Sequence, residues 1–179
     1  AGVDPGPGLA QVQPDEPSLY RVVDPAPSVR LVHEVRPVAG EAVWEALAAP
    51  GHDPTTAAVV APDTPSIVEP AKGEDRVSDL TWQPERISVI VTAGSPALAV
   101  FSLIAYPGWR ATVDGAPADW ITVDGLLVGV PVANGAHRVQ LDYRPASLYL
   151  GGAVTALSLL LTGLLFLPIG PLRRWESAQ

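Results

Sequence analysis

Three of the five tryptophans, Trp82, Trp109 and Trp120, are the side chains best suited to hold a ligand. Their flat aromatic faces could stack on a sugar ring, and Trp109 and Trp120 are therefore the candidate ligand-binding residues. The alternative is that they fill core or membrane-interface positions. For Trp109 the core is favoured, because Ala111 and Val113 share its strand face and are apolar.

Other reactive side chains do not form a recognisable active site. The three histidines, His33, His52 and His137, lie far apart and lack metal-ligand spacing, so we expect no metal and no cofactor. Asp114 and Asp124 each precede a glycine, where aspartate tolerates the backbone of a tight turn. The chain has no cysteine, no nucleophile-elbow serine and no Gly-rich phosphate loop. We therefore expect no catalytic residue and no enzyme activity in this chain.

Composition limits the possible partners and the fold class. The net charge is −8 with only 11 Lys plus Arg, and no basic cluster is visible, which argues against nucleic acid as a partner. The 20 prolines and 16 glycines favour short strands and many turns over long helices. The soluble part should be mainly β.

The elements expected in this part form a β-rich domain over residues 19–145, after a disordered or extended linker over residues 1–18. Residues 28–36 alternate as a single strand with one face in the core and the other mostly in solvent. Residues 97–105 are apolar on both faces, as in a central strand. Asp-Gly or Asn-Gly pairs at 114, 124 and 134 are ten residues apart and predict a meander of short strands. The simplest architecture is a β-sandwich that stands directly on a membrane.

A transmembrane helix is expected over residues 146–168, because the sequence from Ala146 to Leu167 is apolar and uncharged and is long enough to cross a bilayer. Residues 169–179 then form a short cytoplasmic tail. Partners should be membrane lipid and other transmembrane helices, which would lie in the same parent protein or in a complex. The candidate membrane-interface residues are Tyr149, Arg173, Arg174 and Trp175. The candidate helix-packing residues are small: Gly151, Gly152, Thr155 and Ser158.

Two segments carry a family resemblance: "AYPGWRATVDG", and "GLLVGVPVANGAHRVQLDYRPASLYLGG" with the apolar helix that follows it. Together they resemble the C-terminal region of the YfhO-type bacterial membrane proteins, which are related to polyprenyl-phosphate-dependent (GT-C type) glycosyltransferases. The resemblance extends over about residues 19–170. It implies that the β domain faces outward from the bacterial cytoplasmic membrane and that the C-terminus is cytoplasmic. It also implies that the family's catalytic acidic residues lie in an early extracytoplasmic loop, so none of them maps onto this chain.

Three functions follow as hypotheses. The first is a non-catalytic extracytoplasmic β domain and membrane anchor of a YfhO-like protein linked to cell-envelope glycosylation; it expects the gene to encode further hydrophobic segments upstream. The second is a single-pass accessory subunit of a larger membrane complex, for instance a respiratory or photosynthetic one. The third is a carbohydrate-binding module, which depends only on the tryptophans.

Overall fold

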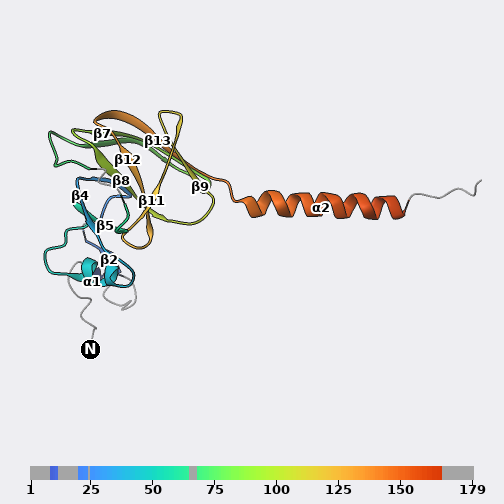
Figure 1. Ribbon diagram of the computed structural model, residues 1–179, viewed down its shortest axis with the longest axis horizontal. Coiled ribbons are helices and arrows are strands. Elements are labelled where there is room, and N and C mark those ends of the chain that lie inside the picture. Colours follow the sequence, from blue (N-terminus) through green and yellow to red (C-terminus); the bar gives the residue numbers. More distant parts are fainter. Residues whose placement is uncertain (1–8, 12–19, 24, 65–67, 167–179) are drawn as a thin grey trace, which may run out of the picture.

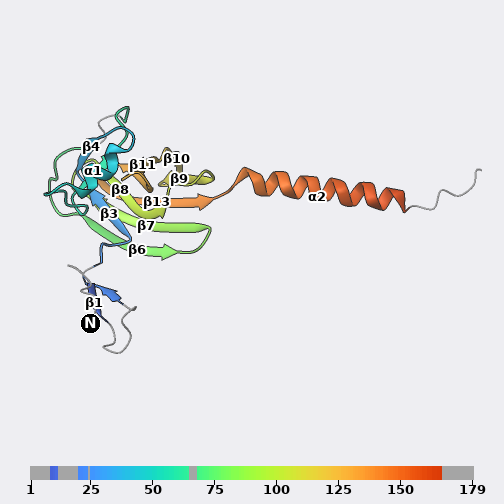
Figure 2. The ribbon, with the colours of Figure 1, turned by 90° about the horizontal axis from the view of Figure 1, so that it is seen from below.

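The computed structural model describes residues 9–11, 20–23, 25–64 and 68–166. These residues form a β domain of two facing sheets, from which a single long helix projects (Figures 1 and 2). The prediction of a mainly β, sandwich-like domain followed by one C-terminal apolar helix is confirmed. Strand β1 (Leu9–Gln11), which lies in the predicted linker, pairs antiparallel with β2 (Tyr20–Val22) in a separate two-stranded sheet.

The first of the two facing sheets has five strands. Their order is β10 (Ala116–Ala118), β9 (Trp109–Val113), β13 (Gly135–Tyr143), β7 (Arg86–Ala93) and β6 (Arg76–Trp82). All four pairings are antiparallel. Strand β7 shows why these residues form a half-buried strand, because alternate side chains from Ile87 to Ala93 are buried between the sheets.

The second sheet has six strands, and it curls back on itself. Its order is β3 (Val29–Val32), β8 (Ala97–Ile104), β12 (Leu127–Val132), β11 (Ile121–Val123), β5 (Ala57–Val60) and β4 (Glu34–Pro37). Strands β3 and β4 lie at opposite edges of this sheet, although only His33 separates them in sequence. The two edges must therefore come close together. A short helix, α1 (Ala42–Ala48), lies between β4 and β5 in the chain.

This curling gives the domain two hydrophobic cores. In β8, Ala97, Ala99 and Phe101 are buried between the two sheets, and Leu98 and Val100 are buried in a second cluster on the other face. The prediction that this strand is apolar on both faces because it is central is confirmed. Strand β8 contributes side chains to both clusters, so the two cores are joined through this strand.

Two sequence-based expectations about strand arrangement are wrong. Residues 28–36 are not one strand with a solvent face: the chain is divided at His33, and all four residues of β3 are buried because the curled sheet covers its second face. The strands after residue 109 are not a meander either. Hairpins β9–β10 and β11–β12 form as expected, but β10 to β11 and β12 to β13 pass from one sheet to the other. Local turn residues specify a hairpin, whereas packing decides which strand pairs next.

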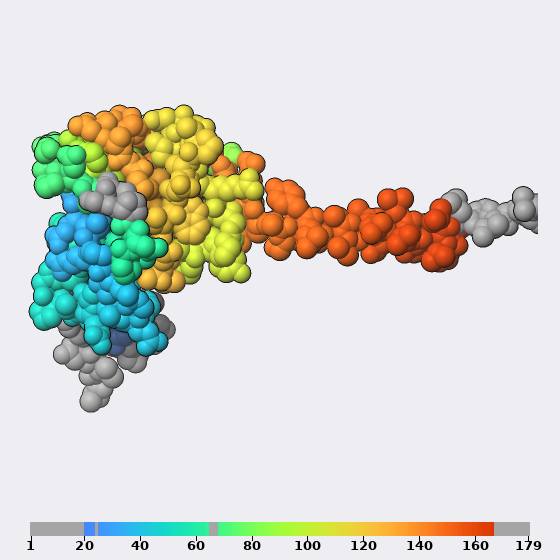
Figure 3. All heavy atoms as spheres, viewed as in Figure 1, coloured from blue at the N-terminus to red at the C-terminus, as the bar shows by residue number. Residues whose placement is uncertain are grey.

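Helix α2 (Ala146–Leu165) has 20 residues, none of them buried, and a mean hydropathy of 1.9. At about 1.5 Å per residue it is long enough to span a bilayer, and its composition is apolar enough. The hydroxyls of Thr155, Ser158 and Thr162 donate to carbonyl oxygens one turn earlier, so no hydroxyl proton of these three is left unpaired in an apolar environment. Figure 3 shows this helix standing clear of the β domain.

Candidate site at the junction of the β domain and the helix

Strand β13 and helix α2 are joined by only two residues, Arg144 and Pro145. The end of β13 and the start of this link are held to two loops of the β domain. The backbone N–H of Arg144 donates to the carbonyl oxygen of Gly108 at 2.7 Å, and the N–H of Tyr143 donates to that of Glu85 at 2.8 Å. The end of β13 and the first residue of the link are therefore anchored to both neighbouring loops.

Glycine is required at position 108 for two reasons. Its φ of +118° is one that residues with a side chain rarely adopt. A Cβ atom there would also lie 2.9 Å from a ring carbon of Tyr143 and 3.1 Å from the Cα of Pro145. The Pro-Gly turn thus packs directly against the link to the helix, and it brings the two segments that carry the family resemblance into contact.

Aromatic rings line this end of the sandwich. Trp109 and Tyr143 face each other across β9 and β13, with ring centroids 5.0 Å apart, and Tyr106 lies 6.5 Å from Tyr143. Trp109 is only 9% exposed and belongs to the core between the sheets, as its apolar neighbours predicted. The indole N–H of Trp120 donates to the carbonyl oxygen of Trp109 at 2.9 Å. The two tryptophans chosen from the sequence are therefore adjacent, although they are 11 residues apart.

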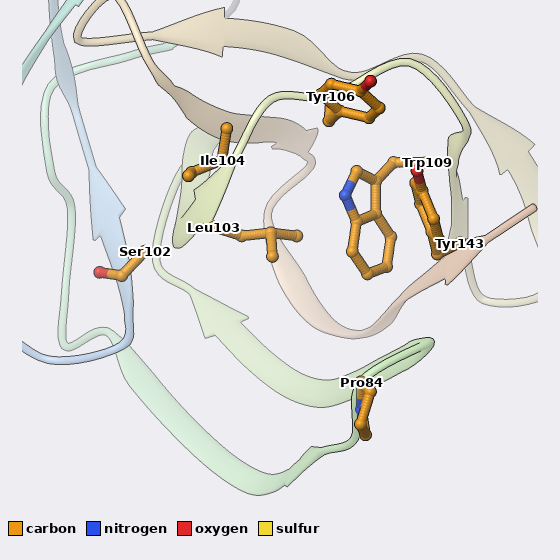
Figure 4. Close-up of a pocket in the computed structure, with 7 residues that line it drawn as sticks. All are labelled: Pro84, Ser102, Leu103, Ile104, Tyr106, Trp109 and Tyr143. Carbon is orange, nitrogen blue, oxygen red and sulfur yellow. The ribbon is translucent and has the colours of Figure 1, made fainter. Parts of the chain in front are cut away.

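Two open grooves meet at Trp109 and Tyr106. The first, of about 450 Å³, opens between the two sheets and is mainly apolar; Figure 4 shows its lining. The second, of about 480 Å³, lies beside the start of α2. Trp120 lines neither groove, and the role of either tryptophan in sugar binding stays a prediction. The apolar groove is lined by Pro84, Ser102, Leu103, Ile104, Tyr106, Trp109 and Tyr143. The second is lined by residues 106–110 and 144–147.

Arginines give the second groove its charge. Arg110 and Arg144 line it, are exposed, and have no carboxylate within 4.0 Å among the described residues. Asp142 lies opposite both Arg86 and Arg110 in the sheet, but its carboxylate accepts hydrogen bonds from Gln140 and, at 2.7 Å, from Arg86. The hydrogen bond from Gln140 and then the contact with Arg86 lower the pKa of Asp142, so this carboxylate stays charged.

At the opposite end of the domain, His33, Asp75 and Ser95 superficially resemble a catalytic triad. His33 Nε2 lies 2.8 Å from an Asp75 carboxylate oxygen, and Ser95 Oγ lies 3.3 Å from His33 Nδ1. However, the Ser95 hydroxyl donates to the carbonyl oxygen of Pro70 at 2.9 Å, and His33 Nδ1 is closer to the carbonyl oxygen of Glu69, at 2.9 Å. Ser95 is also only 1% exposed. The histidine cannot take the serine proton in this arrangement, and the cluster ties residues 69–75 to the sheet.

The two aspartates of the Asp-Gly turns have the backbone that the sequence predicted, with φ of +53° at Asp114 and +52° at Asp124. Asp124 has a second role that the sequence did not reveal. Its carboxylate accepts hydrogen bonds from Arg30 and from the backbone N–H of Val59, each at 2.8 Å, and the Arg30 and Asp124 side chains are only 7% and 9% exposed. This buried ion pair connects β3, β5 and the β11–β12 turn.

Asp114 is exposed and pairs with a histidine. Its carboxylate lies 2.7 Å from His137 Nδ1 and accepts the backbone N–H of Arg138 at 2.8 Å. These hydrogen bonds, that from His137 first, lower the pKa of Asp114. Over the described residues, no three side chains of the metal-ligating types come together, so the structure offers no cluster for a metal.

The structure describes some of the residues predicted for the membrane interface and for helix packing. Tyr149 is exposed in the first turn of α2 and lines a third small groove beside Arg86 and Arg144. The other predicted interface residues, Arg173, Arg174 and Trp175, lie outside the described residues. The helix-packing candidates Gly151, Gly152, Thr155 and Ser158 are all exposed on α2.

Residues 70–155 match the family model described as Bacterial membrane protein YfhO. This region is YfhO-type. The resemblance inferred from the sequence motifs is thereby confirmed for these residues. No curated protein and no solved structure matches the chain.

The YfhO-type region includes the whole five-stranded sheet, the aromatic junction and the first half of α2. It also contains both Asp-Gly turns. A membrane-protein family and an exposed helix of membrane-spanning length agree that the protein is associated with a membrane.

Proposed function

We propose that this chain is a non-catalytic extracytoplasmic β domain and membrane anchor of a YfhO-type protein that serves cell-envelope glycosylation. The observation that carries the proposal is the junction. The YfhO-type region passes from β13 into α2 through a link of two residues, of which Arg144 is hydrogen-bonded to the β domain. Such a short link holds the domain close to the surface of the membrane that α2 enters.

A supporting role rather than a catalytic one is favoured by the state of the polar side chains. Three pairs of charged or histidine side chains hold the fold together: Arg30 with Asp124, His33 with Asp75, and His137 with Asp114. The hydroxyl that resembles a nucleophile, that of Ser95, is buried and donates to a carbonyl. In the proposed role the domain positions other parts of the protein or an acceptor at the membrane surface.

The proposed sidedness can be tested by labelling single cysteines, because the chain has no cysteine of its own. Ala133→Cys lies at an exposed turn of the β domain, and Ser177→Cys lies in the tail beyond α2. In intact cells, a maleimide that cannot cross membranes should label Ala133→Cys and should label Ser177→Cys only after the cells are permeabilised. Labelling in the reverse pattern would refute the extracytoplasmic position.

The link to glycosylation needs a separate readout. Deleting the gene should change the sugar composition of the cell envelope, and the chain carrying Ala133→Cys should restore it. An unchanged composition in the deletion strain would refute the glycosylation role, whatever the sidedness.

A single-pass accessory subunit is the second candidate, and the small residues of α2 favour it. Gly151, Thr155, Ser158 and Thr162 recur at intervals of four, three and four residues, which places them on one face of a fully exposed helix. Faces of this kind allow close packing against another transmembrane helix. Migration of the gently solubilised native chain in a large complex would support this candidate, and migration alone would refute it.

A further inference from the structure

We propose that the junction of the β domain and α2 binds an anionic phospholipid of the surrounding bilayer. The phosphate would lie against Arg110 and Arg144 in the groove beside the helix, and apolar parts of the lipid would lie in the groove between the two sheets. The inference depends on one part of the proposed function, namely that α2 spans the membrane. It does not depend on which side of the membrane the β domain occupies.

The first argument is position. Arg144 and Pro145, which follow strand β13 and line the second groove, come directly before Ala146, the first residue of α2. A helix of 20 apolar residues needs nearly its whole length to cross the hydrocarbon layer, about 30 Å thick. The start of α2, and with it both grooves, must therefore lie at the level of the lipid head groups.

The second argument is the two-part chemistry of the site. One groove is lined mainly by apolar and aromatic side chains, and the other contains two guanidinium groups. The two grooves share Tyr106 and Trp109, so they form one continuous amphipathic surface. Each has a volume within the range of small-molecule sites, roughly 300–1,000 Å³. A phospholipid has the same division into an anionic head and apolar chains.

The third argument is charge. The chain as a whole carries −8, yet its charged groups around the junction are Arg86, Arg110 and Arg144 against Glu85 and Asp142. Asp142 is paired with Arg86, and neither Arg110 nor Arg144 forms a salt bridge within the described residues. Planar guanidinium groups bind phosphate oxygens through two parallel hydrogen bonds. The end of an acidic protein that faces the membrane is thus locally basic.

The fourth argument is the kind of apolar residue that is exposed here. Tyr106 and Tyr149 are 59% and 63% exposed, and Ile104 is 57% exposed. Tyrosine is enriched at the membrane–water interface, where its ring contacts the lipid and its hydroxyl contacts water. A free surface in water would leave this apolar area uncovered, whereas a lipid covers it.

The test uses the full chain in detergent, with an environment-sensitive fluorophore on a single cysteine. Ser102→Cys places the probe at the apolar groove, and Ala133→Cys places a control probe at the other end of the same sheet. Both residues are exposed. Phospholipids with brominated acyl chains, which quench fluorophores on contact, are then titrated in two forms, phosphatidylglycerol and phosphatidylcholine.

We expect brominated phosphatidylglycerol to quench the probe at position 102 at lower concentration than brominated phosphatidylcholine, and neither lipid to quench the probe at position 133 specifically. Replacing Arg110→Gln and Arg144→Gln together should weaken phosphatidylglycerol binding by roughly 5-fold for each arginine, which corresponds to about 1 kcal/mol per basic residue at an anionic surface. Arg138→Gln is the matched control, because Arg138 is exposed on the same sheet but lines neither groove.

Three outcomes would overturn the inference. They are the absence of quenching at position 102, equal affinity for the two head groups, and displacement of the lipid by inorganic phosphate at a similar concentration. Failure of the proposed function is distinguishable from each of them. A reversed labelling pattern of Ala133→Cys and Ser177→Cys would refute the extracytoplasmic position and would leave the lipid titration unchanged.

Discussion

Replacing Asp124 by asparagine removes the negative charge that faces Arg30 inside the second core, with almost no change in shape. Asparagine also tolerates the left-handed backbone that Asp124 adopts, with φ of +52°, so the turn itself should survive. The side-chain oxygen of asparagine can accept the N–H of Val59, as Asp124 Oδ1 now does at 2.8 Å. Its NH₂ group then faces the guanidinium group of Arg30, at the position of an oxygen that now lies 2.8 Å away.

Two donors therefore face each other, and Arg30, which is 7% exposed, is left as an uncompensated buried charge. Turning the amide over would satisfy Arg30 but would leave the N–H of Val59 unpaired. Breaking a buried ion pair from one side costs about 3–5 kcal/mol. We expect a loss near the lower bound, about 3 kcal/mol, because one hydrogen bond survives in either orientation, and a fall in Tm of roughly 10 °C.

The measurement is thermal and denaturant unfolding of the full chain in detergent, followed by tryptophan fluorescence, to which the buried Trp109 contributes. Asp114→Asn is the matched control, because Asp114 has the same backbone in the same kind of Asp-Gly turn but is exposed. It should lose much less stability. A loss below about 1 kcal/mol for Asp124→Asn, or equal losses for the two variants, would show that the buried ion pair does not stabilise this fold.

Three further changes have defined outcomes. Gly108→Ala should destabilise the domain by about 2 kcal/mol or more in the same unfolding assay, because the new Cβ strains the backbone and also clashes with the link to the helix. Gly115→Ala should cost only the backbone strain, about 1 kcal/mol, because a Cβ there meets nothing within 4 Å. Hydrogen bonds lower the pKa of Asp114 in the folded state below 3.8, so this carboxylate stabilises the fold above pH 3.8 and stops doing so as the pH falls through the lowered pKa. The free energy of unfolding, measured as a function of pH, should therefore fall less steeply below pH 3.8 in Asp114→Asn than in the wild-type chain. Gly151→Leu should weaken association of α2 with other helices, as measured by cross-linking in membranes, because it fills the small-residue face.

Each of these expectations can fail in a specific way. Equal losses for the alanine variants at positions 108 and 115 would mean that the close approach at the junction costs nothing. If the free energy of unfolding depends on pH in the same way in the wild-type chain and in Asp114→Asn, then the exposed Asp114 does not contribute to stability through its lowered pKa. Unchanged cross-linking of Gly151→Leu would place the helix interface on another face of α2.

The sequence predicted those features that depend on neighbouring residues. The apolar run over residues 97–105 was identified as a central strand, and the turn at Asp114-Gly115 was predicted from the backbone preferences of its two residues. The motif around Trp109 indicated the YfhO type of the region that contains it, and the apolar neighbours of this tryptophan correctly indicated burial. None of these inferences required knowledge of distant contacts.

The sequence could not predict features that depend on residues far apart in the chain. Arg30 looked like a solvent-facing residue of an alternating strand, and Asp124 looked like a turn residue; they are 94 positions apart, and only the curled sheet brings them together. In the same way, His33 pairs with Asp75 and His137 with Asp114 across loops whose paths no local pattern specifies. The predicted meander was wrong for the same reason, because the order in which strands pair depends on contacts between distant residues.

The sequence by itself determined that the protein is mainly β, that a helix of membrane-spanning length follows the last strand, and that the motifs around residues 105–150 are of the YfhO type. These properties follow from hydrophobic period, helix length and turn residues, which act over a few positions. Only the tertiary structure decided that the Pro-Gly turn at Gly108 packs on the helix link, that two grooves meet at Trp109, and that Arg110 and Arg144 lie together beside the start of α2. The physical reason is that a site is a set of distances, and these distances are set when the two sheets bury their shared core.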